Sequence, residues 1–514
     1  MTVTAAAPAP FAVSGLHRWL VVGTCLIETL AVSLSATIIN VAVPEIMGTF
    51  GVGGDQAQWM ATAFFAAMTT GMLASDWLTR TFGQRYSFVG AILVFIAASV
   101  IGGTAPSFGI IVLARTVQGM AAGVMLPLAM FAMFSVFPPS RRATVTGLFG
   151  ISFVLGPGLG PWFGGLAIDA FDWRFTFYVA LAPAFIAMIG AAFFLPGRNP
   201  ATPRTRFDWQ GFVLVAVFLA ATLTGLSNGQ LRGWNSDFVV FSLLLAGASL
   251  LGFVVWELIV ADPIFDVRLL ANPRFAIANM ISFLFGVTLF GSIYLQPIFV
   301  QIVQNYTPTR AGEVLIPGGL ILGLALPLAG RVSDRIAPQW PIMAGFAVFA
   351  VSHVWLGIVD ANTGFWTFAL LIVIGRAGGG FIFPPLTVAA FREVPPDRLG
   401  AANGMISFTR QLGGAFGINA LAIYLEQHTA FYATVLAATQ TEANAATQAL
   451  LARVQDMLGP AGLPPSTEVA LSKFYLGRVI ATQASALAFA DTFIVLGLTA
   501  VVGAGLGLMV WRRR

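Results

Sequence analysis

The sequence predicts an all-α, polytopic membrane protein, and three observations lead to this prediction. Of the 514 residues, 58% are hydrophobic and only 9% are charged, whereas about a quarter of the residues in soluble domains are charged. Fourteen apolar runs each have roughly the 20 residues that a helix needs to cross the hydrocarbon core of a membrane. The basic residues, all arginine except Lys473, stand mostly between these runs.

The fourteen spans are separated by charged or Pro/Gly-rich segments. The first run is about 24 residues long and continues without a cleavage site, so it is expected to be a retained helix and not a signal peptide. Pro106 is expected in a tight turn. In chain order the spans are 20–43, 56–79, 86–105, 108–136, 143–166, 175–195, 209–229, 238–260, 275–303, 312–332, 340–359, 365–389, 399–425 and 485–511.

The composition excludes several functional classes. The net charge is +5, but the arginines are dispersed between apolar runs, so no nucleic-acid-binding face is expected. A single cysteine, Cys25, excludes an intramolecular disulfide and a cysteine-based metal site. The three histidines are scattered, and no HExxH, GxSxG or P-loop string occurs. We therefore expect neither an enzyme nor a bound cofactor or metal.

The orientation follows from the arginines in the short loops. The loops on one side of the membrane hold 17 basic residues and those on the other side hold 6. Because basic loops remain in the cytoplasm, the first side and both chain termini are expected to be cytoplasmic. The long segment 427–484 is then extracytoplasmic, and it is expected to be either a solvated helical hairpin lying on the membrane or a docking surface for a partner.

Two places in the chain resemble one another and indicate an internal duplication. Residues 76–85 and 330–335 both lie in loops on the cytoplasmic side. Downstream of each, Arg115 and Arg376 precede a glycine-rich stretch. The expected domains are a six-helix bundle over 1–197, two linking helices over 198–274 and a second six-helix bundle over 275–514, which includes the extracytoplasmic loop 427–484.

Five strings carry a resemblance to a known family. Residues 330–335 have the form Gly-x-x-x-Asp-Arg, and Arg115 begins an Arg-x-x-Gln-Gly string. The strings over 37–44, 156–165 and 410–417 lie on the first, fifth and thirteenth spans. Together they resemble the major facilitator superfamily and, within it, the 14-helix drug:proton antiporter family (EmrB/QacA-like).

The resemblance implies the major facilitator fold with two linking helices between its bundles. It further implies export of hydrophobic or amphipathic compounds from the cytoplasm, driven by protons, across the inner membrane of a bacterium. In an organism with two membranes, the resemblance adds a periplasmic adaptor and an outer-membrane channel as partners. An exporter of one endogenous metabolite, siderophore or peptide, and a non-transporting receptor or assembly factor on this fold, are the alternatives.

The chain departs from the family pattern in two places. Ser35 stands where the family usually has an aspartate, five residues before Asn40. Asp76 and Arg80 stand where the family usually has glycine and aspartate. The usual carboxylate of proton coupling is therefore missing, and its role has to be assigned from the residues of this chain.

Glu28 and Arg115 are the candidate proton-coupling residues. Glu28 is the single acidic residue inside the first span, and a carboxylate within a membrane is costly unless it has a function. It lies seven residues, or two helical turns, before Ser35. We expect Glu28 to carry the proton and Arg115 to control its release. The alternatives are a protonated structural glutamate and an arginine that tethers helices through backbone carbonyls.

Further candidates concern conformational change. Glycine and proline in the fifth span suit a gate or, alternatively, a static interface; they are Gly156, Pro157, Gly160, Pro161, Gly164 and Gly165. A conformational latch is expected from Asp76, Arg80 and Gly83 in one half and from Asp334 and Arg335 in the other. For Asp76 and Arg80, four residues apart, an ion pair on the helix surface is the alternative.

The remaining candidates concern substrate and protons. Residues expected to line an apolar cavity are Asn40, Phe64, Phe65, Phe283, Phe285, Phe290 and Tyr294, with lipid-facing or packing roles as the alternative. Glu313 and Asp491 are secondary candidates for proton binding, and an interfacial position is the alternative for each.

Overall fold

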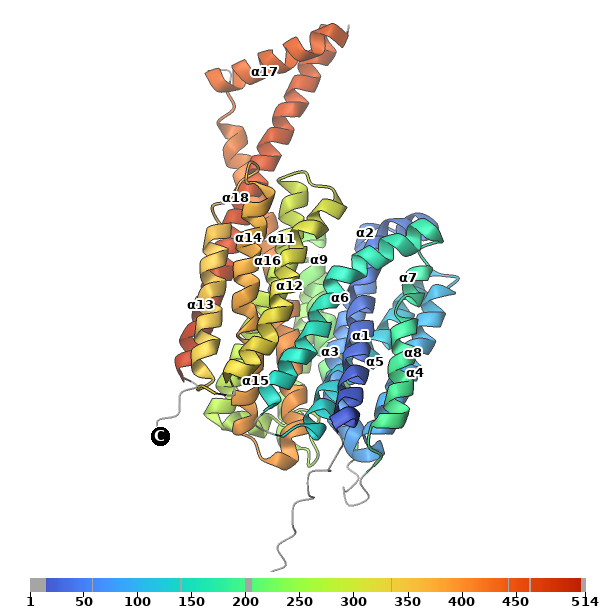
Figure 1. Ribbon diagram of the computed structural model, residues 1–514. Helices are drawn as coiled ribbons and strands as arrows, with labels where there is room; N and C mark the ends of the chain where they lie inside the picture. Colours follow the sequence, from blue (N-terminus) through green and yellow to red (C-terminus); the bar gives the residue numbers. More distant parts are fainter. Residues whose placement is uncertain are drawn as a thin grey trace, which may run out of the picture.

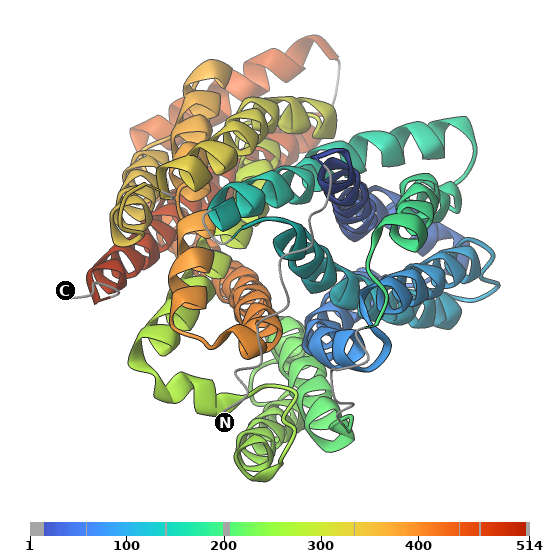
Figure 2. The same cartoon turned by 60° about the horizontal axis from the view of Figure 1, so that its bottom comes forward.

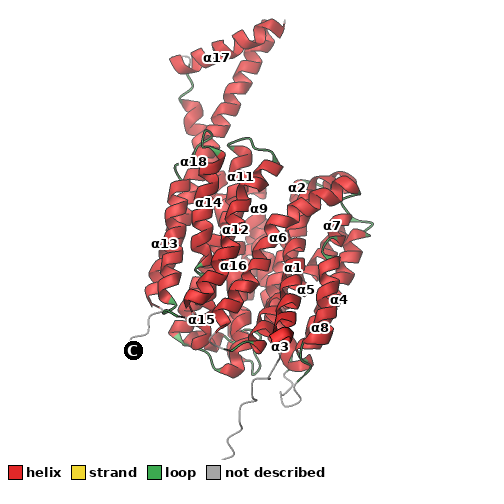
Figure 3. Cartoon of the chain, viewed as in Figure 1, coloured by secondary structure: helices red, strands yellow, loops and turns green. Residues whose placement is uncertain are grey.

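The computed structural model describes residues 15–57, 59–138, 141–198, 206–333, 335–441, 443–461 and 464–509. This part of the chain contains helices and connecting turns and no strand (Figure 3). Each of the fourteen predicted spans coincides with one helix or with two successive short helices. The predicted all-α membrane fold is therefore confirmed.

The first half of the chain forms one group of packed helices (Figure 1). Helix α1 packs along α6 and α8, and α5 lies against α3 and α4. The elements are α1 (Gly15–Phe50), α2 (Gly54–Ala57), α3 (Trp59–Phe82), α4 (Gln84–Gly103), α5 (Phe108–Val136), α6 (Arg142–Ala170), α7 (Phe175–Tyr178) and α8 (Leu181–Phe194).

The second half forms another group, and two helices connect the groups. Helices α9 (Trp209–Arg232) and α10 (Asp237–Ile259) lie together at one edge, where α9 contacts α3 and α16 (Figure 2). The elements of the second group are α11 (Pro273–Ile302), α12 (Pro308–Ser333), α13 (Gln339–Leu356), α14 (Phe365–Gly380), α15 (Phe383–Arg392), α16 (Leu399–Ala438), α17 (Ala445–Leu458) and α18 (Pro465–Met509). The domain boundaries at 197/198 and 274/275 stay a prediction.

Eleven helical segments in the described part of the chain are long and apolar enough to cross a membrane. The three predicted spans outside this set correspond to α3, α6 and α16. Helix α3 carries several threonines with Asp76 and Arg80, and α16 carries Arg410 and Glu426, which lowers the hydropathy of both helices. Several side chains of α6 lie outside the described part of the structure. Each of the three helices packs against helices of both halves.

Glycine lets the helices approach closely within each half. A Cβ atom at Gly119 or Gly123 of α5 would collide with the backbone of Phe64 or Met68 on α3. In the second half, a Cβ atom at Gly413 of α16 would collide with the backbone of Phe283 on α11. In a lipid environment such contacts between backbones replace the hydrophobic effect as the main source of helix association.

The segment 427–484 is helical, as expected for a helical hairpin, but its outer helices continue directly from the predicted spans. Helix α16 continues to Ala438 and α18 begins at Pro465, so both helices extend well past the predicted span ends. With α17 they form a triangular protrusion that stands away from the bundle and does not fold back along it (Figure 1). The 40 residues of α16 correspond to about 60 Å of helix, roughly twice the hydrocarbon thickness.

The two ends of the bundle carry different elements, after which they are called the hairpin side and the terminal side. The hairpin side carries α17, and the terminal side carries the start of α1 and the end of α18 (Figure 1). Helices α1, α6, α11 and α16 run from the terminal side to the hairpin side, whereas α3, α5 and α12 run in the opposite direction.

Candidate functional site

Arg115 is the centre of a buried polar network in the first half. Its side chain is only 1% exposed. Its Nη1 donates to Oε1 of Gln118 at 2.7 Å and to the hydroxyl of Ser35 at 3.3 Å, and its Nε donates to the carbonyl of Met60 at 3.3 Å. The guanidinium also lies 4.0 Å from the ring centroid of Phe64. All of these partners are neutral.

The network extends across four helices. The amide of Gln118 donates to the hydroxyl of Ser99 on α4 at 2.7 Å. Arg115 also donates to the backbone carbonyl of Ser35 on α1 at 3.1 Å. Arg115 and Gln118 together therefore join helices α1, α3, α4 and α5, which fits both the predicted coupling role of Arg115 and the alternative role of a tether between helices.

Glu28 is fully buried on α1. The hydroxyl of Thr29 donates to its Oε2 at 3.1 Å, and its Oε1 has no hydrogen-bond partner among the described residues. Within the same residues Glu28 forms no salt bridge. Seven residues separate Glu28 from Ser35, which corresponds to about 10 Å along the helix. Arg115 and Glu28 therefore do not form an ion pair in this conformation.

The predicted gate lies where α6 packs on α1. A Cβ atom at Gly156, Gly160 or Gly164 would collide with Ser33, with Thr37, or with Ile38 and Val41, respectively. The Thr37 hydroxyl donates to the carbonyl of Gly156 at 3.2 Å. Gly165 has open space around it. Pro157 and Pro161 belong to α6, but their side chains lie outside the described part of the structure.

The predicted latch lies on the terminal side. Arg80 Nε binds Asp76 Oδ2 at 2.8 Å within α3. Asp76 Oδ1 also lies against Gly400, in the first turn of α16 in the other half. Gly83 has a φ of +85° in the turn before α4, where a Cβ atom would collide with Arg198. Asp334 lies outside the described residues, and Arg335 is exposed after the end of α12.

Contacts between the two halves gather on the terminal side. The amide of Asn403 on α16 donates to the carbonyl of Pro127 on α5 at 3.2 Å. The rings of Phe134 and Phe391 meet edge to face with centroids 5.5 Å apart. Cβ atoms at Gly147 and Gly150 of α6 would collide with Leu326 of α12. The two halves are therefore packed closely on the terminal side.

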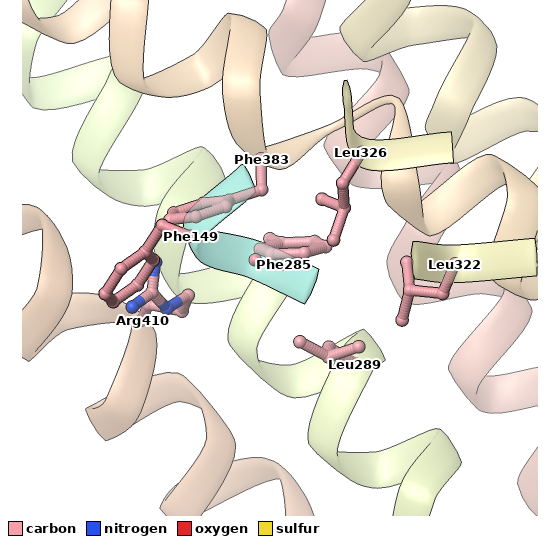
Figure 4. A pocket seen from close by; sticks show the side chains of 8 residues that line it. Phe149, Phe285, Leu289, Leu322, Leu326, Phe383 and Arg410 are labelled. Atoms are coloured by element: carbon pink, nitrogen blue, oxygen red, sulfur yellow. The ribbon is translucent and has the colours of Figure 1, made fainter. Parts of the chain in front are cut away.

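A small pocket lies between the halves, next to these contacts (Figure 4). The rings of Phe285 and Phe383 are stacked with centroids 6.1 Å apart. The guanidinium of Arg410 lies 4.3 Å from the ring centroid of Phe383. Helix α6 contributes one wall, and α11, α12, α15 and α16 contribute the rest. The lining residues are Phe149, Gly150, Phe285, Leu289, Leu322, Leu326, Phe383 and Arg410.

Of the aromatic residues expected to line a cavity, Phe285 lines this pocket and the others do not. Phe64 packs against Phe65 and Arg115. Phe290 packs against Gly414 on α16. Phe283, Tyr294 and the exposed Asn40 lie elsewhere on α11 and α1. The sequence did not single out Phe149 or Phe383, and it singled out Arg410 only as the first residue of the string 410–417.

The two secondary proton candidates lie toward the hairpin side. Glu313 is exposed near the start of α12. Asp491 Oδ2 accepts a hydrogen bond from the hydroxyl of Tyr432 at 2.7 Å and lies 3.1 Å from Nδ1 of His428. These contacts join α18 to α16 at the base of the protrusion. Among the described residues, no group of three or more His, Cys, Asp and Glu side chains is placed to hold a metal ion.

Comparison with known proteins gives a consistent result. A bacterial relative, the "Multidrug resistance protein B homolog" of Mycobacterium tuberculosis H37Rv, is 30% identical over 421 residues, covering 80% of this chain and 77% of the relative. The "Multidrug export protein EmrB" of Escherichia coli K12 is 28% identical over 405 residues, covering 76% and 78%. An uncharacterized transporter of Bacillus subtilis, YcnB, is 29% identical over 422 residues, covering 81% and 88%.

The fold has counterparts among solved structures. The crystal structure of the human organic anion transporter MFSD10 superposes with a TM-score of 0.62 and 12% sequence identity, covering 94% of this chain and 99% of that chain. At this identity the similarity concerns the fold alone. The sequence profile of the Major Facilitator Superfamily matches residues 26–418. The chain therefore belongs to the Major Facilitator Superfamily and is a multi-pass membrane transporter of small molecules, not an enzyme.

Proposed function

We propose that this transporter is a proton-coupled antiporter of the 14-helix drug:proton family, which exports hydrophobic or amphipathic compounds from the cytoplasm of a bacterium. The observation that carries the proposal is the mostly apolar pocket between the two halves, lined by Phe149 of one half and Phe285 and Phe383 of the other. An apolar pocket with few polar groups suits hydrophobic ligands. Two relatives with 28–30% identity are named as multidrug proteins, which supports the same function.

The terminal side is proposed to face the cytoplasm. The short loops on this side carry most of the arginine residues, as expected for cytoplasmic loops. With this orientation, the close contacts Asn403–Pro127 and Phe134–Phe391 close the cytoplasmic side. The structure then corresponds to a conformation that is shut toward the cytoplasm, and the opposite conformation of the transport cycle would break these contacts.

Glu28 is proposed to carry the proton. It is fully buried, and its Oε1 is without a hydrogen-bond partner in the described part of the chain, so a proton on this carboxyl would remove the cost of a buried charge. Arg115 keeps its charge and holds α1 through Ser35. A change in the charge of Glu28 therefore acts on the same helix that Arg115 holds and that α6 packs against.

The contacts of the predicted gate and latch are proposed to rearrange during the transport cycle. The small residues Gly156, Gly160 and Gly164 allow α6 to slide along α1. Asp76, Arg80, Gly83 and, after the end of α12, Asp334 and Arg335 are proposed to favour the conformation that is closed toward the cytoplasm. A periplasmic adaptor and an outer-membrane channel are proposed as partners on the hairpin side if the organism has two membranes.

The experiment is proton movement in liposomes that contain the purified protein and a pH-sensitive dye. Lipophilic drugs are added under an imposed proton gradient, and the unchanged protein is compared with Glu28→Gln. Glu45→Gln is the matched control, because Glu45 lies on the same helix but is exposed.

We expect drug-dependent proton movement with the unchanged protein and with Glu45→Gln, and its loss with Glu28→Gln. Movement that survives Glu28→Gln would keep antiport and overturn the role of Glu28. Absence of movement with every compound tested would overturn multidrug antiport and favour an exporter of a single metabolite.

A further inference from the structure

Two buried carboxylates face one another where the linking helices α9 and α10 meet. Asp208 is the residue before α9 and is 7% exposed, and Glu257 lies in the last turn of α10 and is fully buried. A Cβ atom at Gly211 would collide with Oδ2 of Asp208 and would lie 2.6 Å from Oε1 of Glu257. The two oxygens therefore converge on one point and lie within about 5 Å of each other, a distance at which two like charges oppose one another's ionisation.

The hydrogen bonds of this pair leave the two facing oxygens without a donor. Oδ1 of Asp208 accepts from the backbone N–H of Gly211 at 2.9 Å and from the indole of Trp256 at 2.7 Å. Oε2 of Glu257 accepts from the backbone N–H of Phe265 at 3.2 Å. Oδ2 of Asp208 and Oε1 of Glu257 have no hydrogen-bond partner among the described residues. Because an ionised carboxylate can only accept, a hydrogen bond between these two oxygens requires a proton on one of them.

The cations nearest to the pair are engaged with other groups. Within the described residues, neither Asp208 nor Glu257 belongs to a salt bridge. Asp266 adds a third carboxylate, only 3% exposed, and it is paired with Arg398 in the turn before α16. Arg268 donates to two backbone carbonyls at the end of α10. The surroundings of the pair therefore add negative charge close by and place the positive charge on other partners.

The elements that pack against α9 and α10 carry further charged residues. On α3, Asp76 is paired with Arg80, and on α16 Arg410 lies over the ring of Phe383. Arg274 is paired with Glu393, and the exposed residues are Arg206, Arg232, Asp237, Asp262, Arg392 and Glu426. The segment 199–205, which contains Arg204, and the side chain of Asp397 lie outside the described part of the structure.

From this arrangement we propose that Asp208 and Glu257 bind one proton between them, so that the protonated carboxyl of one donates a hydrogen bond to the carboxylate of the other. A shared proton replaces two opposed buried charges by one charge that is held by hydrogen bonds. In the described part of the chain, no group of three or more His, Cys, Asp and Glu side chains is placed to hold a metal ion, which favours a proton over a cation. This site is separate from Glu28 on α1, and it does not depend on the proposed export function.

The proton is expected to influence the second half of the chain. Its loss leaves two carboxylates facing each other and favours separation of α9 from α10. Glu257 also holds the backbone of Phe265, and the next residue, Asp266, is tied to Arg398. The ring of Phe265 meets that of Phe408 on α16 with centroids 5.5 Å apart. Protonation of the linking helices is therefore connected to the position of α16.

The test is infrared spectroscopy of the purified full-length protein in lipid nanodiscs at neutral pH. A protonated carboxyl has a C=O stretching band that is distinct from the bands of a carboxylate and shifts in D2O. All proteins carry Glu28→Gln, so that a proton on Glu28 does not contribute. We expect the band in this parent and its loss after Glu257→Gln, whose amide N–H takes the place of the proton and donates to Asp208.

Asp237→Asn is the matched control for the infrared measurement. Asp237 lies on the same helix as Glu257 but is exposed in its first turn. Its replacement should leave the band unchanged. A band that survives Glu257→Gln would overturn the proposal.

Thermal unfolding at several pH values gives a second readout. The folded protein keeps the proton at pH values where the unfolded chain loses it, so raising the pH should destabilise the folded state, by up to about tenfold in the unfolding equilibrium per pH unit. Glu257→Gln should lose this part of the pH dependence. Asp208→Asn provides the same comparison if Glu257→Gln does not fold. Parallel pH curves for the parent and the folded variants would overturn the proposal.

A monovalent cation and Arg204 are the competing partners of the pair. The proposal is wrong if the band is missing from the parent and the unfolding midpoint rises when choline chloride is replaced by sodium chloride. Arg204→Gln should leave the band unchanged, and a band that appears only after this substitution would assign the neutralising role to Arg204. These measurements use neither a substrate nor a proton gradient, so their outcome is independent of the transport assay.

Discussion

Arg115 donates a hydrogen bond to the hydroxyl of Ser35 at 3.3 Å and another to its backbone carbonyl at 3.1 Å. Ser35 is the residue that stands where the family resemblance leads one to expect an aspartate. The structure therefore brings this altered position into direct contact with the arginine of the Arg-x-x-Gln-Gly string. In this chain a neutral hydroxyl takes the place of an ion pair, and the carboxylate of α1 is found two turns away, at Glu28.

Replacing Ser35 by aspartate should create an ion pair with Arg115. Ser35→Ala removes one hydrogen bond, which costs about 1 kcal/mol, and should lower the thermal unfolding midpoint slightly. Ser35→Asp should instead raise the midpoint, because the new carboxylate meets an arginine whose partners are all neutral. The two variants are compared with the unchanged protein by thermal unfolding. A larger loss with Ser35→Asp than with Ser35→Ala would show that the carboxylate does not reach Arg115.

Much of the fold could be predicted from the sequence because membrane spans follow from composition and length. The lengths of the helices outside the membrane could not. Helix α16 continues past the membrane because no proline interrupts the chain between Glu426 and Ala438. Helices α16 and α18 also stabilise one another through the hydrogen bond from Tyr432 to Asp491. The sequence predicted a helical hairpin lying on the membrane there. Hydropathy reports where the membrane is and not where a helix ends, so the continuation of α16 and α18 into the protrusion was not predicted.

The candidate site was predicted less completely. Glu28 and Arg115 stood out because a charge within an apolar span is unusual, and both are buried in the structure. Hydropathy could not indicate which aromatic residues face one another, since Phe285 and Phe290 look alike in the sequence but only Phe285 lines the pocket. Arg410 was not predicted to line a pocket because the pocket forms only where the two halves of the chain pack together, and hydropathy does not report that packing.

Gly123 should be intolerant of any larger side chain. Its α-carbon faces the backbone of Met68, so a Cβ atom would collide with main-chain atoms that cannot rotate away. Gly123→Ala should therefore destabilise the protein by about 1–3 kcal/mol. The matched control is Gly109→Ala on the same helix, where nothing lies within 4 Å of the added atom. The yield of monodisperse protein and its unfolding midpoint should fall for Gly123→Ala alone; equal values for both variants would contradict the close contact of α3 and α5.

Neutralising Asp76 should weaken the contact between the halves on the terminal side. The carboxylate of Asp76 lies against Gly400 at the start of α16, where the helix dipole favours negative charge by about 0.3–1 kcal/mol. Asp76→Asn should therefore raise the fraction of molecules open on this side, by about fivefold for 1 kcal/mol.

The opening can be measured by maleimide labelling of Leu326→Cys. Cys25 is the single cysteine and is buried, so Cys25→Ser provides the background. Leu326 is 3% exposed and packed against Gly150, and its labelling requires separation of α6 and α12. Asp237→Asn, at the start of α10 on the hairpin side, is the control. Equal labelling rates for the Asp76 and Asp237 variants would argue against the latch.

The close packing of the two linking helices, α9 and α10, should depend on the absence of a side chain at Gly211. Asp208 Oδ1 accepts hydrogen bonds from the backbone of Gly211 at 2.9 Å and from the indole of Trp256 at 2.7 Å. A Cβ atom at Gly211 would collide with the other oxygen of Asp208 and would lie 2.6 Å from Oε1 of Glu257. Gly211→Ala should therefore separate α9 from α10 at this end and lower the unfolding midpoint. Gly247→Ala, within α10 and with open space around it, should have no such effect. Equal midpoints would mean that the carboxylates can move aside without cost.

The protrusion on the hairpin side should be held upright by Tyr432. Its hydroxyl donates to Asp491 at 2.7 Å and thereby joins α16 to α18 just below the triangle. Tyr432→Phe removes a hydrogen bond to a charged group, which is worth about 1.5–3 kcal/mol, so local opening of the two helices should become at least about tenfold more frequent. Limited trypsin digestion reports this opening, because Arg453 and Lys473 are exposed within the protrusion.

Cleavage at these sites should be faster for Tyr432→Phe than for Thr434→Val. Thr434 lies on the same helix, but its hydroxyl donates only to the backbone of its own helix, at Ala430. Cleavage tracks the open population when opening is fast relative to proteolysis, so the ratio of the two rates measures the tie between α16 and α18. A ratio near one would mean that packing along the two helices, and not the contact with Asp491, keeps the protrusion standing.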